Sequence, residues 1–155
     1  MSILSPSPVP SSRTEPQPAG LHQLTRGDFR LTPMPGEKLL RIAIIGFWDP
    51  GTTARFAIAL PIAVEALGTR SGEHLILADI TRSAIQAQEV MNRLTAMIVR
   101  SANRARRLAL LGLGTGVRMQ ARRLLNAREN LALFDNEAEA LAWLARGAYP
   151  ATVRR

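Results

Sequence analysis

The sequence predicts an α/β fold in which a mixed, mostly parallel sheet is covered by helices. Short apolar runs of strand length alternate with longer amphipathic segments of helical period, which is typical of strand–helix–strand units. In the clearest unit, the apolar run 74–78 stops at Asp79, and an amphipathic segment then extends to about Ala105. Other such units flank it on both sides, so the predicted sheet has five strands.

Length and composition limit the classes of protein to consider. The chain has 155 residues, of which 46% are hydrophobic and 21% charged, as expected for one globular domain with a core of its own. No apolar run reaches the roughly 18 residues of a membrane span. The chain has no cysteine, which excludes disulfides, thiolate nucleophiles and thiolate metal ligands. Residues 1–20 lack the features of a signal peptide, so a cytoplasmic location is expected.

The composition changes along the chain. Residues 1–25 hold five prolines and several serines, and this composition predicts a disordered tail. Residues 26–148 are expected to form the domain, and residues 149–155 a loose end.

The first part of the domain reads as a hairpin followed by a helix. Residues 29–31 predict a short edge strand and residues 38–48 a second strand, joined by a turn with Gly36 at positive φ. Asp49 is placed to cap a helix whose first residue is Pro50, and this helix is expected to end at Gly68. Its predicted core stripe is Ala57, Leu60, Val64 and Leu67. Pro61 inside it indicates either a fixed kink or a flap over a pocket.

The second helix is predicted to start at a capping box. Ser83 and Gln86 match the S-x-x-Q pattern, in which each side chain satisfies a free amide at the helix start. Arg100 and Arg104 would then lie in its last turns. The expected core-facing residues are Ile85, Val90, Leu94, Met97 and Ile98.

Two further units complete the chain. Residues 107–113 predict a fourth strand, and the turn 114–116 leads into a helix that extends through Ala127 with a stripe of apolar side chains. Residues 131–134 predict the fifth strand, and Asn136 caps a closing helix. The predicted element order is ββαβαβαβα. The buried stripes of these two helices are Val117, Ala121, Leu124 and Leu125, and Leu141, Trp143 and Leu144.

This order, the strand that ends in Asp79, and the closing stretch 131–144 (LALFDNEAEALAWL) resemble the STAS domain, the family of sulphate transporters and anti-sigma-factor antagonists. The resemblance covers about residues 27–147 and is closest to the stand-alone, antagonist-like members. It implies a regulatory module that is not an enzyme and that binds a partner protein.

In phosphorylatable members of that family, the switch is a serine in an Asp-Ser-Ser-Gly turn at the start of the second helix. Here the turn reads Asp-Ile-Thr-Arg-Ser over residues 79–83. Asp79 matches the acid that ends the strand, and Ser83 is only roughly in place, while the Ser-Gly pair is missing. Phosphorylation of Ser83 or Thr81 is therefore a hypothesis, and the capping role of Ser83 is the simpler interpretation.

Several polar residues follow predicted strands and would meet at one edge of a parallel sheet, where ligands bind in such folds. This candidate ligand edge consists of Asp49, Asp79, Trp48, Gly114 and Thr115. For each of them a structural role is the alternative: helix capping for the acids, a buried anchor for Trp48, and a tight turn for the glycine-rich segment. The sequence predicts no catalytic residue, metal site or cofactor, because the glycine spacing differs from G-x-G-x-x-G and neither histidine has a partner.

Charge is the most unusual local feature. The formal net charge is +8, and no Asp or Glu occurs in residues 90–128. A basic surface for an acidic partner protein is predicted there, from Arg100, Arg104, Arg107, Arg118 and Arg122. A merely solvated face and an Arg-rich composition are the alternatives. The first functional hypothesis is thus a regulatory protein-binding module, the second a module that binds a small molecule or lipid at the strand-end edge, and the third, weaker, a non-specific nucleic-acid binder.

Overall fold

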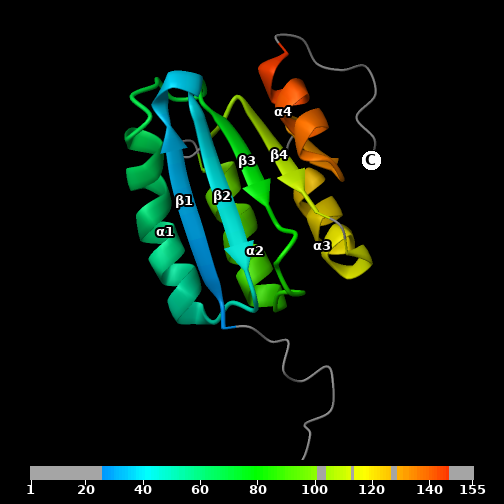
Figure 1. The fold of residues 1–155 in the computed structure, drawn as a ribbon. Coiled ribbons are helices and arrows are strands. Elements are labelled where there is room, and N and C mark those ends of the chain that lie inside the picture. The colour runs from blue at the N-terminus through cyan, green and yellow to red at the C-terminus, as the bar shows by residue number, and fades with distance from the viewer. Residues whose placement is uncertain (1–25, 101–103, 113, 127–128, 147–155) are drawn as a thin grey trace, which may run out of the picture.

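The computed structural model describes residues 26–100, 104–112, 114–126 and 129–146. Over these residues, five strands and four α-helices follow one another as ββαβαβαβα, which confirms the predicted order (Figure 1). The tail predicted for residues 1–25 and the loose end predicted for residues 149–155 lie outside the described residues, as do Leu113 and Ala127 at the ends of two predicted elements.

The five strands form one mixed sheet and lie in it in sequence order. β1 is antiparallel to β2, as predicted, and the other neighbours are parallel. The strands are β1 (Asp28–Met34), β2 (Leu39–Ile45), β3 (Leu75–Asp79), β4 (Arg107–Leu111) and β5 (Leu131–Phe134).

The turn of the hairpin differs in detail from the prediction. A short 3₁₀ helix, η1 (Pro35–Glu37), joins β1 to β2, and the Lys38 N–H closes it on the Pro35 carbonyl at 3.1 Å. The positive φ expected at Gly36 is wrong, because the left-handed residue is Lys38, with φ 53°. Four residues, 35–38, connect the paired residues Met34 and Leu39, two more than in a two-residue hairpin loop.

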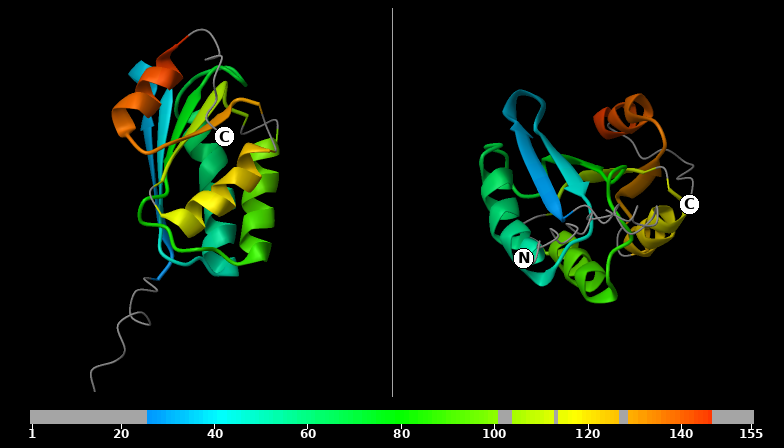
Figure 2. Two further views of the ribbon diagram at one scale, coloured as in Figure 1. Left: turned by 90° about the vertical axis from the view of Figure 1, so that its right-hand side faces the viewer. Right: turned by 60° about the horizontal axis from the view of Figure 1, so that its bottom comes forward.

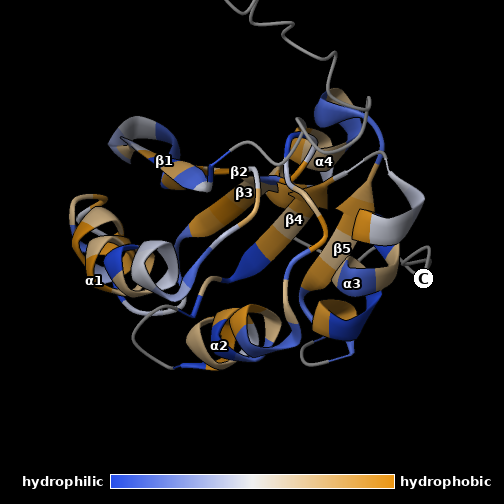
Figure 3. Cartoon of the chain, turned by 90° about the horizontal axis from the view of Figure 1, so that it is seen from below, coloured by the Kyte–Doolittle hydropathy of each residue, from blue (hydrophilic) through white to orange (hydrophobic). Residues whose placement is uncertain are grey.

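Three helices cover one face of the sheet, and the fourth covers the other (Figures 2 and 3). The parallel strands are added one after another in the same direction. Because strand–helix–strand crossovers are right-handed, the three connecting helices lie on the same face. These helices are α1 (Pro50–Glu65), α2 (Gln88–Val99) and α3 (Thr115–Leu125); α4 (Glu137–Ala145) follows β5.

The core accordingly has two layers. The larger layer lies between the sheet and α1–α3 and includes Leu40 and Ile76. The smaller one lies under α4 and includes Leu77, Ala109 and Trp143. Successive residues of one strand, such as Ile76 and Leu77, face opposite layers, as the strand geometry requires.

The predicted start of the second helix is wrong. α2 begins at Gln88, with Ala87 as a cap that has no side-chain hydrogen bond, so Ser83 and Gln86 form no capping box. Residues 80–87 instead form a loop whose Ser83 pairs with Gly46, beyond the end of β2. The loop is held extended at this point because the Arg82 carbonyl accepts from the Gly46 N–H at 2.9 Å and the Ala84 N–H donates to the Gly46 carbonyl at 3.1 Å, so these groups take no part in a first helical turn.

Two other expectations for this helix are also wrong. α2 ends at Val99, so Arg104 is not part of it, and Arg100 and Arg104 do not share a helix face. Ile85 is 58% exposed and does not face the core. The remaining members of the predicted stripe are buried or packed against the core: Val90, Leu94, Met97 and Ile98.

Candidate functional site

The loop between β3 and α2 (residues 80–87), here called the β3–α2 loop, is held by the side chain of Gln86. This side chain is almost fully buried, with 6% of the residue exposed. Its Oε1 accepts from the Trp48 N–H at 2.8 Å, and its Nε2 donates to the Gly46 carbonyl at 2.8 Å. The same Nε2 lies 3.0 Å from both Ser83 Oγ and the Ala84 carbonyl. One buried amide therefore ties the loop to the chain that follows β2.

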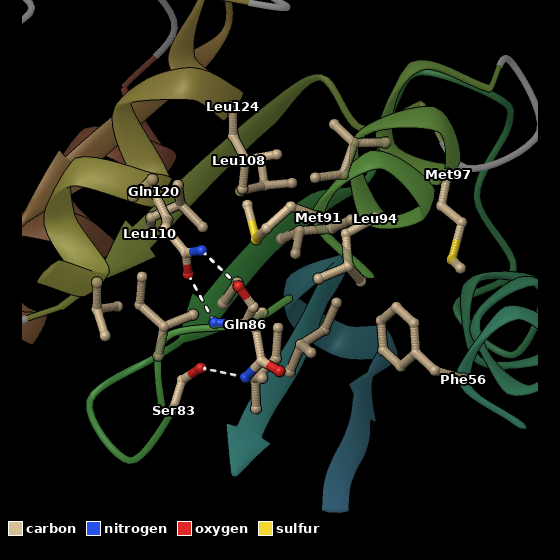
Figure 4. A pocket seen from close by; sticks show the side chains of 18 of the residues that line it. Phe56, Ser83, Gln86, Met91, Leu94, Met97, Leu108, Leu110, Gln120 and Leu124 are labelled. Carbon is tan, nitrogen blue, oxygen red and sulfur yellow. Dashed lines mark hydrogen bonds between the residues drawn. The ribbon is translucent and has the colours of Figure 1, made fainter. Parts of the chain in front are cut away.

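A second glutamine holds the same loop from α3. The Gln120 Oε1 accepts from the Gln86 N–H at 2.9 Å, and the Gln120 Nε2 donates to the Gln86 carbonyl at 2.8 Å (Figure 4). The loop is thus fastened on two sides, although it belongs to neither a helix nor a strand. Sequence reasoning missed both roles. One signal was available in the sequence: Gln120 lies three residues after Val117 and one before Ala121, next to the buried apolar stripe of its helix, where a polar side chain needs a hydrogen-bond partner.

The two hydroxyls proposed as phosphorylation sites have different surroundings. Thr81 is exposed, and Asp79 Oδ1 accepts from its N–H at 2.9 Å and from its Oγ1 at 2.6 Å. Ser83 is half-buried, and its Oγ donates to the Ala84 carbonyl at 2.9 Å while it accepts from Gln86. Neither residue lies at the start of α2. A phosphate on Ser83 would therefore have to displace the Gln86 contacts, whereas Thr81 is reachable from solvent.

A cavity of about 80 Å³ lies beside this loop, between the sheet and helices α1–α3 (Figure 4). Its lining is apolar except at the end formed by Ser83, Gln86 and Gln120. No Asp, Glu, His, Lys or Arg is among the lining residues, so the cavity offers binding but no acid–base chemistry. Its apolar walls include Phe56 and Leu60 of α1, Met91 and Leu94 of α2, and Leu124 of α3.

The glycine-rich turn before α3 serves close packing. A Cβ added at Gly116 would lie 2.5 Å from Ile85 Cδ1, and one at Gly112 would lie 3.0 Å from Ile80 Cγ1. Gly114, by contrast, has open space around it and caps α3 without a side-chain bond. Two of the three glycines are thus explained by the β3–α2 loop that crosses over them.

Four of the five residues of the predicted ligand edge lie at the expected ends of the strands, and the fifth, Trp48, is buried. Asp79, Asp49, Gly114 and Thr115 lie at the carboxyl ends of their strands, as expected. Trp48 does not offer a stacking face, because it is 1% exposed, packs against Phe29 and Phe56, and donates from Nε1 to the Asp28 carbonyl at 3.0 Å.

Asp49 acts as the predicted cap of α1. Its Oδ1 accepts from the Thr52 N–H at 2.6 Å. This bond, with a further contribution from the Thr52 side chain and from the charges of Arg26 and Arg55, lowers the pKa of Asp49 below its usual value. The carboxylate is therefore committed to the helix start.

The five arginines predicted to form one basic surface do not lie together, although Arg118 and Arg122 are one turn apart on α3. Arg107 is wrongly included: it is 4% exposed, lies 5.2 Å from the Trp143 ring and donates to the Trp143 carbonyl, because its strand position faces α4. Arg118 is half-buried and forms an ion pair with Asp135. Arg104 precedes β4 and Arg118 follows it, so the two lie toward opposite ends of the sheet. Arg100, Arg104 and Arg122 are exposed.

Among residues 26–100, 104–112, 114–126 and 129–146, no group of three or more His, Asp or Glu could hold a metal ion. In the same part of the chain, no helix has the length and hydropathy needed to cross a bilayer. The candidate site is the β3–α2 loop, which Gln86 and Gln120 hold by hydrogen bonds, together with the largely apolar cavity beside it.

Comparison with protein-family models and with the sequences of curated proteins found no match. Solved structures do match. One is an uncharacterized protein of the DUF3478 family from Shewanella loihica PV-4, described as having a SpoIIAA-like fold. It aligns with a TM-score of 0.62 and 16% identity over 77% of this chain and 95% of that one. The chain has a SpoIIAA-like, STAS-type fold.

A second solved structure with this fold is an anti-sigma factor antagonist from Mycobacterium paratuberculosis. It aligns with a TM-score of 0.53 and 11% identity over 77% of this chain and 96% of that one. At these identities the likeness establishes the SpoIIAA-like fold and confirms the expected architecture. It does not transfer a partner or a modified residue, which have to be argued from the residues themselves.

Proposed function

We propose that this protein is a regulatory module that binds a partner protein through the β3–α2 loop. The likeness to an anti-sigma factor antagonist supports this class of function. The observation that carries the proposal is the position of Ile85, which is 58% exposed on a loop that Gln86 and Gln120 hold in place. An apolar side chain on a preorganised loop can serve as an anchor, since little conformational entropy is lost when it binds.

The charges around the loop favour an acidic partner. Arg82 is exposed on the loop itself, and Arg122 and Arg123 are exposed on the neighbouring helix α3. Arg123 donates to Gln88 Oε1 at 2.8 Å, which places it beside the first residue of α2, directly after the loop. These arginines would steer an acidic surface toward Ile85 and contribute mainly to the association rate.

Thr81 is the side chain on which a regulatory phosphate would act most directly. It is exposed, and its hydroxyl already donates to Asp79. A phosphate there would lose this hydrogen bond, repel the Asp79 carboxylate and alter the loop that carries Ile85. Ser83 is the second candidate, and a phosphate on its Oγ would break the hydrogen bond from Gln86 Nε2.

A capture experiment with matched variants tests the interaction. The tagged chain would be compared with Ile85→Lys and with Val99→Lys, which changes another apolar residue that is exposed to a similar extent, 52%, at the far end of α2. A stoichiometric acidic protein that is retained by Val99→Lys and lost with Ile85→Lys supports the proposal. Equal binding by both variants contradicts it, and capture that disappears after nuclease treatment indicates nucleic acid.

Binding of a small apolar ligand is a second candidate function, which the cavity favours. At about 80 Å³ the space suits a compact hydrocarbon group, which would contact the apolar walls of the cavity. Ala121 lines it and is buried, so Ala121→Leu fills part of the space, whereas Ala96→Leu adds the same group on the exposed side of α2. Xenon, detected by NMR shifts of the Met91 and Leu94 methyl groups, should bind the wild type and Ala96→Leu but not Ala121→Leu. Equal shifts in all three proteins would reject this site.

A further inference from the structure

The outer face of α1 is unusual among the helices that cover the sheet. α1 lies at the edge of the molecule beside β1, and no other element lies on its outer side in Figure 3. Its core face is formed by Thr53, Phe56, Leu60 and Ala63. On the opposite face, Ile58 and Ile62 are 69% and 64% exposed. A helix that is apolar on both sides is normally covered on both sides.

The composition of this outer face differs from that of its neighbours. Six of the ten exposed residues of α2 and α3 are charged or amide-bearing, and the two large apolar residues exposed there, Val99 and Met119, lie one on each helix. The exposed residues of α1 after its first turn are Ala54, Arg55, Ile58, Pro61, Ile62 and Glu65. Only two of these are charged, and they carry opposite charges.

The order of these residues is self-complementary. Arg55 lies five residues before position 60, and Glu65 lies five residues after it. Ile58 and Ile62 lie two residues before and two residues after the same position. When a second α1 packs antiparallel across a two-fold axis at position 60, each Ile58 meets an Ile62. At the same time each Arg55 comes level with a Glu65 of the other copy, on both ends of the contact.

The angular positions agree with this arrangement. At about 100° per residue, Ile58 and Ile62 lie about 40° apart around the helix, with Glu65 about 20° beyond Ile58 and Arg55 about 20° beyond Ile62. The two isoleucines therefore form the centre of the face, and the two charges form its borders. Arg55 and Glu65 lie about 15 Å apart along the axis, too far to pair within one helix.

We infer that α1 is the contact surface of a homodimer, in which two copies pack their α1 helices antiparallel through Ile58 and Ile62, with Arg55–Glu65 ion pairs at both ends. The inference is independent of the proposed function, which uses the β3–α2 loop. In the monomer, the Arg55 guanidinium lies 5.9 Å from the Phe29 ring centre and donates to Thr52 Oγ1 at 3.3 Å. These are weak surface contacts that the side chain can exchange for a carboxylate.

Other occupants fit the face less well. An anionic membrane surface would be repelled by Glu65, and the single cation on the face is Arg55, whereas helices that lie on membranes carry several basic residues. Pairing through the neighbouring edge strand is discouraged by Pro33 and by the exposed Arg30 in β1.

Sedimentation equilibrium of the full chain tests the dimer. One helix pair covers less area than a standard interface, so a dissociation constant on the order of 100 µM is expected, within reach of loadings from about 10 µM to about 1 mM. Ile62→Glu should weaken the dimer at least about tenfold, because two apolar contacts are lost by symmetry. Met119→Glu, which changes an apolar residue of α3 that is exposed to a similar extent, 62%, is the matched control and should dimerise as the wild type does.

Charge exchange tests the antiparallel register. Arg55→Glu alone brings two carboxylates together at each end, and Glu65→Arg alone brings two guanidinium groups together, so each should weaken the dimer. The double variant Arg55→Glu/Glu65→Arg should restore it, with circular dichroism showing that all variants fold.

Three outcomes would overturn the inference: a monomer at every loading, a dimer that Ile62→Glu leaves unchanged, or a double variant as weak as the single ones. Binding to phosphatidylcholine–phosphatidylglycerol vesicles that Ile62→Glu abolishes, without self-association, would assign the face to lipid instead.

Discussion

Gln120 on α3 bonds both main-chain polar atoms of Gln86, with its Oε1 2.9 Å from the Gln86 nitrogen and its Nε2 2.8 Å from the Gln86 oxygen. A side-chain amide here replaces the backbone partner that a neighbouring strand would offer. Gln86 in turn uses its own side chain to bond Gly46 and Trp48. The conformation of the β3–α2 loop therefore depends on α3 and on the end of β2 together.

Gln120→Ala should loosen this loop. Two hydrogen bonds to a partly buried peptide group are lost, which should lower the free energy of unfolding by about 1–3 kcal/mol. Hydrogen exchange of the amides in residues 80–87 should accelerate. Gln88→Ala, which removes an exposed amide bonded only to the exposed side chains of Asn92 and Arg123, is the control and should change stability by less than about 0.5 kcal/mol. Similar effects of the two variants would contradict the role given to Gln120.

Gly116→Ala should move the Ile85 side chain without lowering the free energy of unfolding, so it tests the position of Ile85 separately from stability. The new Cβ would lie 2.5 Å from Ile85 Cδ1, the flexible end of an exposed side chain that can move away. Because alanine is also the better helix former, stability should be unchanged or rise by up to about 1 kcal/mol. The displacement of Ile85 should nevertheless weaken binding to the partner. Retained affinity would show that the position of Ile85 is unimportant.

Gly27→Ala provides the contrasting case. Its Cβ would lie 2.4 Å from the Phe47 main-chain oxygen, which cannot move without moving the backbone. This variant should lower the free energy of unfolding by about 2 kcal/mol or more, measured by urea unfolding. A stable Gly27→Ala protein would place the first residues of the domain differently from the structure described.

Arg107→Ala should be a stability variant and not a binding variant. The guanidinium is buried against Trp143 and donates to its carbonyl, which also accepts from the Arg146 N–H, so its loss leaves a cavity under α4 and removes one of the two hydrogen bonds to this carbonyl. A decrease of about 2–4 kcal/mol in the free energy of unfolding is expected. Arg122→Ala, on the exposed side of α3, should change stability by less than about 0.5 kcal/mol. The reverse order would contradict the burial of Arg107.

Asp49 should make folding stability depend on pH in the acid range. Its pKa is lowered in the folded protein, chiefly by the hydrogen bond from the Thr52 N–H, from an ordinary value of 3.8. The unfolded chain therefore takes up the proton first. The stabilisation is complete above pH 3.8 and is lost as the pH falls through the lowered folded pKa. Asp49→Asn keeps an acceptor without the charge, so its urea midpoint should fall less between pH 6 and pH 3. A parallel fall in both proteins would exclude Asp49 as the cause.

The strands were predictable from local sequence because their signal is strong. β3, β4 and β5 are buried on both faces, so each must be a nearly continuous apolar run, and the hydrophobic pattern alone identifies them. The caps of α1 and α4 were predictable for a similar reason: Asp49 and Asn136 each bond an amide three residues ahead. Such contacts need no information from elsewhere in the chain.

The start of α2 could not be predicted in this way. Ser83 and Gln86 have the spacing of a capping box, but their side chains bond to each other, and the Gln86 side chain also donates to the Gly46 carbonyl, 40 residues away. A local pattern cannot show that a distant carbonyl will compete for the same donor. The arginines present the same difficulty, since Arg107 and Arg122 look alike in sequence, and only the packing of α4 on β4 buries the first.

By itself, the sequence determined the order of the strands and helices, the approximate limits of the elements other than α2, and the STAS-type architecture. These follow from the period of apolar residues and from bonds between near neighbours. The tertiary structure alone decided which polar side chains are buried, where the β3–α2 loop is fastened, and that the outer face of α1 stays exposed. Those features depend on which distant groups meet, because a hydrogen bond or an apolar contact forms between surfaces that only the folded sheet and its helices bring together.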